Sequence, residues 1–360
     1  MNWVEERGRR LAYFAGCDYL RLSWHPELRA ALSGGERSAV SAGASRATTG
    51  NLPVYVALER ELARFFGVGG AVLTSTGYAA PLVAVQGLAR EHTHVLLDEQ
   101  AHACLNDAAL LSGLPVARFP HLDVVGLKAA IQRSGRRARV LVLTDGVWSA
   151  TGEVTPLGDY LEVIPAGSRL FVDDAHGAGV LGRRGRGTAE WAGLPPEAVV
   201  TTMTLSKAFG CFGGAVLASE ATAAVIRANS RLYVGNTGIP PSLARAGLVA
   251  LALMRREGGE RRARMRGNAA RIREVLPNSG GFGAASGIEE TPLVVCAPRG
   301  EAEVQRLVRR LRRSGIHPPL IRYPNGPTER FFRFAITSEH EPEMLERLVG
   351  VLTESGSRAI

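Results

Sequence analysis

The sequence contains no apolar run that approaches the roughly 18 residues of a membrane-spanning helix, and the longest smooth candidate is Ala246–Met254. Its first ten residues, MNWVEERGRR, include two glutamates and no apolar core, so they do not resemble a signal peptide. The four cysteines are scattered, without a CxxC motif or another metal-ligand spacing. We therefore expect a cytoplasmic protein with no metal site and no membrane association.

Aromatic residues are also few, at 6%, whereas the 46% apolar and 21% charged residues are typical of a globular enzyme. A length of 360 residues allows one large domain and a smaller one, each with its own core. The formal charge is +9, but the arginines are spread along the chain and no nucleic-acid recognition motif accompanies them. We interpret the excess as a solvated basic surface, or as an attraction for an acidic small molecule or an acidic carrier protein, and expect no nucleic-acid partner.

Short apolar runs alternate with helical patterns through the first two thirds of the chain. The expected strands are 71–74, 95–97, 140–144, 170–172, 199–203 and 215–218. Continuously apolar strands separated by helices predict a largely parallel sheet that is covered on both faces. Beyond it, an Arg-rich helix over 241–276 precedes a strand, helix, strand and helix at 292–296, 302–314, 331–336 and 342–354.

This order predicts three parts of the chain. Residues 1–45 are expected to form an irregular arm with a short helical piece at 25–32. Residues 46–245 are expected to form a large cofactor-binding domain. Residues 246–360 are expected to hold the long connecting helix and a small C-terminal α/β domain.

Polar residues follow four of the expected strands, in the segments STGY (75–78), DG (145–146), DDAH (173–176) and TLSK (204–207). Ligands of open parallel sheets bind at the carboxyl ends of the strands. An acid at one strand end and a lysine at another suit pyridoxal 5′-phosphate (PLP), which needs a lysine Schiff base, a carboxylate for its ring nitrogen and a phosphate cup. Gly77, at the start of a helix, fits that cup, and Thr204 and Ser206 add hydroxyl donors.

Two segments, VDDAHGAGVLGRRGRG (172–187) and TLSKAFGCFGG (204–214), resemble the signatures of the α-oxoamine synthases. The similarity continues in order from Asp18 through SRATTG (45–50), His102 and Pro240-Pro241 to Arg333. The chain is thereby identified as a member of this family of PLP-dependent acyltransferases. Membership implies an α/β fold, PLP-dependent transferase fold type I (aspartate aminotransferase-like), with a mainly parallel seven-stranded sheet in the large domain. It also implies a homodimer with shared active sites.

The resemblance implies roles for four catalytic residues. Lys207 holds PLP as a Schiff base and carries the α-proton of the substrate, and Asp173 pairs with the pyridine nitrogen. His176 contacts the ring hydroxyl, and His102 stacks on the ring. The alternative for His102 is a histidine that caps the following helix.

Further cofactor and substrate residues follow from the same resemblance. The residues expected to bind PLP besides these four are Ser149, Gly77, Tyr78, Thr204, Ser206 and, through the phosphate of the partner subunit, Thr237. Arg333 matches the family's arginine that binds the substrate carboxylate, and strand alternation points it away from Phe332 and Phe334, which disfavours a plain surface arginine. Cys17 stands where the family has asparagine, and Ser45 suggests room for alanine, so both are expected beside the substrate.

The implied reaction joins an amino acid (alanine, glycine or serine) to an acyl-CoA or acyl-carrier-protein thioester, with loss of CO2, to give an amino ketone. The length of the chain and the segment LSWHPEL (22–28) favour the 8-amino-7-oxononanoate synthase branch, which uses a pimeloyl thioester and L-alanine in biotin biosynthesis. The alternatives are a 2-amino-3-ketobutyrate CoA ligase, an α-oxoamine synthase of a secondary pathway, and a PLP aminotransferase of the same fold. A PLP-sensing regulator is disfavoured, because no helix-turn-helix pattern precedes SRATTG.

Overall fold

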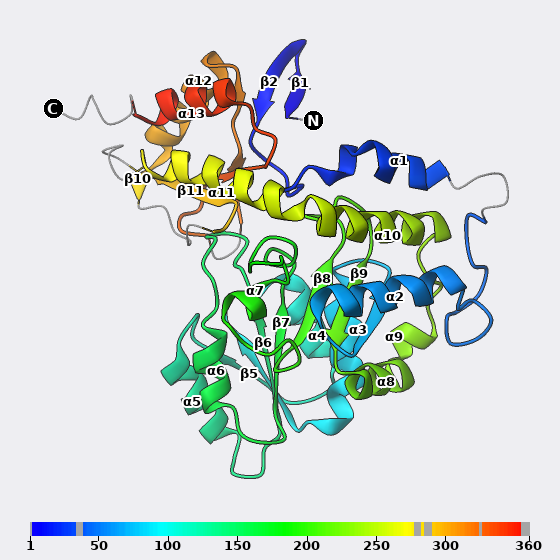
Figure 1. Cartoon of the computed structure of the whole chain (residues 1–360). Coiled ribbons are helices and arrows are strands. Elements are labelled where there is room, and N and C mark those ends of the chain that lie inside the picture. Colours follow the sequence, from blue (N-terminus) through cyan, green and yellow to red (C-terminus); the bar gives the residue numbers. More distant parts are fainter. Residues whose placement is uncertain (1, 34–38, 277–281, 284–289, 324–325, 354–360) are drawn as a thin grey trace. The chain divides into compact units, whose positions relative to one another are not determined.

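The computed structural model in Figure 1 describes residues 2–33, 39–276, 282–283, 290–323 and 326–353. The chain divides into two compact units. The larger unit contains Leu22–Val147 and Thr155–Arg256, and the smaller unit contains Met1–Arg21, Trp148–Val154 and Glu257–Ile360. This division differs from the expected one, because the first 21 residues and a short internal segment belong with the C-terminal region, and the expected boundary at 245 falls inside a helix.

A seven-stranded sheet forms the centre of the larger unit, in the order β3-β9-β8-β7-β6-β4-β5. Its strands are β3 (Gly70–Thr74), β4 (His94–Asp98), β5 (Val116–Phe119), β6 (Val140–Asp145), β7 (Arg169–Asp173), β8 (Val200–Thr204) and β9 (Gly214–Ala218). Only β9 runs antiparallel to its neighbours, β3 and β8. The expected mainly parallel seven-stranded sheet is confirmed, although β5 has an exposed start and was missing from the sequence prediction.

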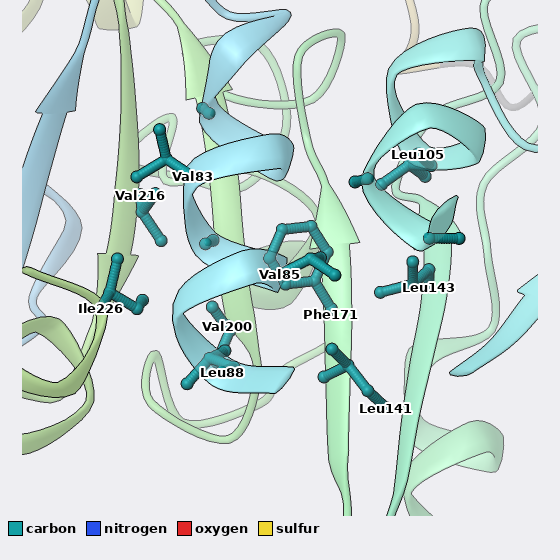
Figure 2. Close-up of a cluster of buried hydrophobic side chains, with 14 of the residues drawn as sticks. Val83, Val85, Leu88, Leu105, Leu141, Leu143, Phe171, Val200, Val216 and Ile226 are labelled. Atoms are coloured by element: carbon teal, nitrogen blue, oxygen red, sulfur yellow. The ribbon is translucent and has the colours of Figure 1, made fainter. Parts of the chain in front are cut away.

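Helices cover both faces of this sheet. The helices described in the larger unit are η1 (Leu22–Trp24), α1 (Pro26–Ser33), α2 (Pro53–Phe66), α3 (Ala79–Leu88), η2 (Ala89–Glu91), α4 (Ala103–Leu111), α5 (Val124–Arg133), α6 (Leu157–Val163), α7 (Thr188–Trp191), α8 (Glu220–Asn229), α9 (Arg231–Val234) and α10 (Pro241–Arg256). Figure 2 shows Val83, Val85 and Leu88 of α3 against strand residues such as Phe171. The alternate residues of β6, Val140 and Val142, pack in a second cluster with α5 and α6. Because both faces of β6 are buried, its residues read as a continuous apolar run.

In its described residues, the smaller unit holds two short sheets and three helices. The sheets have the orders β1-β2-β12 and β10-β11-β14-β13. The elements are β1 (Trp3–Glu6), β2 (Arg9–Tyr13), α11 (Gly258–Arg273), β10 (Phe282–Gly283), β11 (Leu293–Pro298), α12 (Glu301–Arg313), β12 (Ile316–His317), β13 (Leu320–Ile321), β14 (Phe331–Ala335) and α13 (Pro342–Thr353). The first strands are not an irregular arm, because Ala12 and Phe14 pack into the apolar core of this unit with Phe332 and Phe334.

The helix expected over 241–276 is two helices, α10 and α11, separated at Glu257. Gly258 and Gly259 follow the break, and glycine is a poor helix former. Glu354, the expected end of the last helix, lies outside the described residues. None of the helices in the described part of the chain combines the length and apolar composition that a bilayer crossing requires.

Candidate functional site

A cavity of about 240 Å³ lies at the carboxyl ends of the central strands of the larger unit. Its lining residues are Thr76, Gly77, Tyr78, His102, Cys104, Asp145, Asp173, Ala175, His176, Thr204, Ser206 and Lys207. They come from the ends of β3, β4, β6, β7 and β8 and from the segments that follow these strands. The structure therefore brings together the four residues expected to be catalytic and most of those expected to bind the cofactor.

Lys207 and His176 face each other in this cavity. Their Nζ and Nε2 atoms are 2.7 Å apart, and the lysine is half-buried while the histidine is buried. A hydrogen bond at this distance requires that one nitrogen carries a proton and the other a lone pair. The pair can therefore hold a proton between them inside the cavity.

His102 occupies the N-cap of α4, where its Nδ1 accepts a hydrogen bond from the backbone N of Cys104 at 3.3 Å. The capping alternative considered for this histidine is thus observed together with its place in the cavity lining. Burial lowers the pKa of His102, and the nearby Lys207 ammonium lowers it further, although Asp173 acts in the opposite direction. The ring is therefore neutral, as suits a flat surface for stacking.

Two carboxyl groups lie side by side at the floor of the cavity, because Asp145 and Asp173 are register neighbours on β6 and β7. Burial raises the pKa of Asp145 well above its ordinary value, and the charge of Asp173 raises it further. Two carboxylates in one buried site do not both ionise readily, so Asp145 is the neutral member of the pair. Both carboxyl groups line the cavity.

The turn after β3 makes a close approach to the end of β8. A Cβ on Gly77 would lie 2.6 Å from the Cβ of Thr204, so only glycine fits there. The Thr76 hydroxyl accepts a hydrogen bond from the backbone N of Ala79 at 3.1 Å, and Thr204 Oγ1 lies 3.1 Å from Ser206 Oγ. This corner offers hydroxyl groups and a helix start at one end of the cavity.

Tyr78 stands at the rim of this corner with its ring exposed. Its hydroxyl donates a hydrogen bond to Asp107, and this bond, with burial, raises the pKa of Tyr78 to about 12. Its ring centroid lies 6.1 Å from that of His102, at an interplanar angle of 71°. Tyr78 is thus a neutral phenol beside His102.

Ser45 and Thr237 belong to the larger unit but do not line the cavity. They pair in an isolated antiparallel bridge, and the Ser45 hydroxyl donates to the carbonyl of Val234. Next to Ser45, the buried guanidinium of Arg46 forms a two-pronged ion pair with Glu59, with N–O distances of 2.5 and 2.9 Å. This ion pair anchors the segment that carries Ser45.

Arg333, Ser149 and Cys17 belong to the smaller unit. Arg333, on β14, donates from Nη1 to the carbonyl oxygen of Ser149 at 2.9 Å. Tyr19 donates its backbone N–H to the carbonyl of Cys17. Burial raises the pKa of the Tyr19 hydroxyl, and the electrostatic interaction with Cys17 raises it further. Arg333 partly offsets this rise, so its positive charge lies close to the Tyr19 ring.

Four residues of the cavity lining were not among the expected site residues: Thr76, Cys104, Asp145 and Ala175. Three of them, Thr76, Asp145 and Ala175, lie in the strand-end segments that the sequence analysis singled out. Asp145 had a signal, because it ends a strand as Asp173 does. Cys104 also had a signal in the sequence, because it lies two residues after a histidine that could cap a helix and therefore falls in the first turn of that helix. Atoms of His102, Cys104 and Asp173 that could ligate a metal lie within 4.8 Å of one another, and hydrogen bonds among these residues account for their proximity.

Comparison with known proteins identifies relatives along nearly the whole chain. The family model "Aminotransferase class I and II" matches residues 16–352. An 8-amino-7-oxononanoate synthase from Methylococcus capsulatus is 40% identical over 348 residues, which cover 95% of this chain and 88% of that protein. Among solved structures, a serine palmitoyltransferase from S. paucimobilis with a bound PLP–myriocin aldimine has a TM-score of 0.90, with 25% identity and coverage of 99% and 89%. The 8-amino-7-oxononanoate synthase of Francisella tularensis has a TM-score of 0.80, with 25% identity and coverage of 96% and 97%.

Proposed function

Because the chain belongs to the aminotransferase class I and II family, and within it to the α-oxoamine synthases, we propose that it is an enzyme that makes 8-amino-7-oxononanoate from L-alanine and a pimeloyl thioester. The observation that carries this proposal is the cavity that gathers Lys207, Asp173, His176 and His102 at the strand ends. The 40% identity to an enzyme named for that product supports the choice within the family.

The cavity residues fit PLP on the chemistry of their side chains. Asp173 supplies the carboxyl group for the ring nitrogen, because it ends β7 and lines the cavity. The missing Cβ of Gly77, against Thr204, leaves the hydroxyl-rich corner open for a phosphate. Lys207 supplies the amine, and its position against His176 directs Nζ into the same cavity.

When bound, PLP acts as an electron sink that stabilises a carbanion at the α-carbon of an amino acid. The residues of the chain then have separate tasks in our proposal. Asp173 keeps the proton on the ring nitrogen, and Lys207 Nζ takes the α-proton and later returns one. The neutral ring of His102 covers the cofactor plane, and Arg333 binds the substrate carboxylate before CO2 is lost.

The proposal has further components at the borders of the site. Tyr78, Thr204 and Ser206 would bind the phosphate, and Ser149 would lie near the ring oxygen. Thr237 would reach the phosphate of the partner subunit in a homodimer, a role that its exposed position on a bridged segment supports. Cys17 and Ser45 would lie beside the amino acid.

The acyl donor would be a coenzyme A ester or an acyl-carrier-protein ester, and a basic chain of net charge +9 favours either acidic donor. Four free cysteines, two of them buried, support a reducing cytoplasm as the location.

A direct test supplies the PLP-loaded protein with carboxyl-labelled L-alanine and pimeloyl-coenzyme A. We expect labelled CO2, free coenzyme A and an amino ketone in equal amounts. Glycine and L-serine with the same thioester, and glycine with acetyl-coenzyme A, serve as comparisons. Preference for glycine with acetyl-coenzyme A would favour the ligase alternative. Formation of pyridoxamine phosphate without any thioester would favour the aminotransferase alternative and contradict our proposal.

A further inference from the structure

The thiol of Cys104 lies between two residues of the cofactor site. Cys104 is buried in the first turn of α4, with 1% of its surface exposed. Its Sγ donates a hydrogen bond to Asp173 Oδ2 at 3.1 Å and lies 3.0 Å from Nδ1 of His102. The side chain therefore touches both the proposed partner of the ring nitrogen and the proposed stacking ring.

The hydrogen-bond geometry determines where the thiol proton goes. Nδ1 of His102 already accepts from the backbone N of Cys104, so the neutral ring carries its proton on Nε2. A thiol has a single proton, and a carboxylate is a stronger acceptor than a ring nitrogen that is already engaged. Burial raises the pKa of the Cys104 thiol far above its ordinary value, and the negative charge of Asp173 adds to this effect. Cys104 is thus a neutral donor to Asp173.

Asp145 holds the same end of α4 through a second hydrogen bond. Its Oδ2 accepts a hydrogen bond from the backbone N of His102 at 2.9 Å, so the N-terminus of α4 is tied to β6. The same short segment, from His102 to Cys104, is tied to β7 through the thiol. The His102 ring and the Asp173 carboxyl group are therefore held at a set separation by one turn of helix.

We propose that Cys104 is a positioning residue that orients the Asp173 carboxylate for PLP, an inference that rests on the proposed function. The thiol acts through its donor proton rather than through its volume. Serine is smaller than cysteine but keeps a hydrogen-bond donor, so we expect it to preserve PLP binding. Alanine has no donor, so we expect it to weaken PLP binding.

The test measures the PLP dissociation constant of the protein and the rate at which the loaded protein loses PLP. The variants are Cys104→Ala and Cys104→Ser. Cys296→Ala, at a fully buried cysteine in the core of the smaller unit, is the matched control for loss of a sulfur. We expect Cys104→Ala to raise the dissociation constant about tenfold, the scale of one hydrogen bond to a charged group, and Cys104→Ser to stay within about threefold of the unchanged protein.

Three outcomes would overturn this role. Equal affinities in all variants would show that the thiol does not position Asp173. Equal losses in the alanine and serine variants would assign the effect to packing. Equal losses in Cys104→Ala and Cys296→Ala would assign it to general destabilisation. Should Cys104→Ala fail to fold, Cys104→Thr and Cys104→Val provide the same comparison, because they share a shape and only threonine donates. A protein without substitutions that takes up no PLP would overturn the proposed function as well, which separates the two failures.

Discussion

Nζ of Lys207 lies 2.7 Å from Nε2 of His176, although the two residues follow different strands, β8 and β7. The contact exists because β7 and β8 are parallel neighbours, so the segments that leave their carboxyl ends emerge at one edge of the sheet. It gives the only lysine of the cavity lining a basic partner that can share its proton. Several properties of the site follow from this arrangement and can be measured.

Lys128 and Lys207 are the only lysines in the sequence, which makes the attachment of PLP easy to locate. Lys128 is exposed on α5. Borohydride reduction of the PLP-loaded protein should label the peptide that contains Lys207. Lys207→Ala should lose both the label and the long-wavelength absorbance of the lysine-bound cofactor, whereas Lys128→Ala should keep both. A label that persists in Lys207→Ala, measured by peptide mass spectrometry, would move the cofactor elsewhere.

Gly77→Ala should weaken PLP binding, because the new Cβ would lie 2.6 Å from the Cβ of Thr204 and displace the proposed phosphate corner. Gly158→Ala is the matched control, since a Cβ there meets nothing within 4 Å. Gly158 lies in α6, so alanine should stabilise the protein by up to about 1 kcal/mol. PLP titration and thermal unfolding of both variants check this. Unchanged PLP affinity in Gly77→Ala would show that the turn can move without loss of the site.

Arg333→Lys should raise the KM for the amino acid about tenfold or more while PLP uptake stays unchanged. Lysine keeps the charge but loses the planar fork that binds a carboxylate with two hydrogen bonds. Arg330→Lys is the control, because Arg330 pairs with Glu301 at 2.6 Å. Steady-state kinetics over a range of alanine concentrations measure the effect. The same KM in both variants would rule out Arg333 as the carboxylate ligand.

His340 should make the protein sensitive to acid. Its Nδ1 accepts from the backbone N of Thr337, its Nε2 lies 3.0 Å from the carbonyl of Tyr13, and burial lowers its pKa to about 4. The unfolded chain binds a proton to this histidine below about pH 6.5 and the folded chain does not. The stability from this difference is therefore complete above about pH 6.5 and is lost as the pH falls through about 4, up to about 3 kcal/mol.

Urea unfolding between about pH 4 and about pH 7 tests this by comparison with His340→Gln, which should be less stable but should lose less stability with acid. The comparison is needed because Asp174, whose pKa burial raises to about 7, changes stability in the opposite direction. Parallel pH curves for the two proteins would contradict the assignment to His340.

The sequence predicted most strands of the large sheet and most of the residues that line the cavity because their signals are local. A strand buried on both faces shows a run of consecutive apolar residues, as Val140–Leu143 of β6 do. A lysine that follows a strand end is likewise visible within one short segment. The hairpin of β1 and β2 could not be predicted from local sequence signals. Its place depends on the pairing of Ala12 with Ile316, some 300 positions away in the sequence, and no local pattern reports such a pairing.

By itself, the sequence determined the mainly parallel sheet, the strand ends that carry chemistry, and the four residues gathered around one cavity. Only the tertiary structure decided which further side chains meet there. Asp145 became part of the site because it is in register with Asp173, and Cys104 because the first turn of α4 places its thiol against that same carboxylate. Periodicity along a chain specifies which face of an element is buried. Contacts across strands and helices depend on register and packing, which exist only once the sheet is assembled.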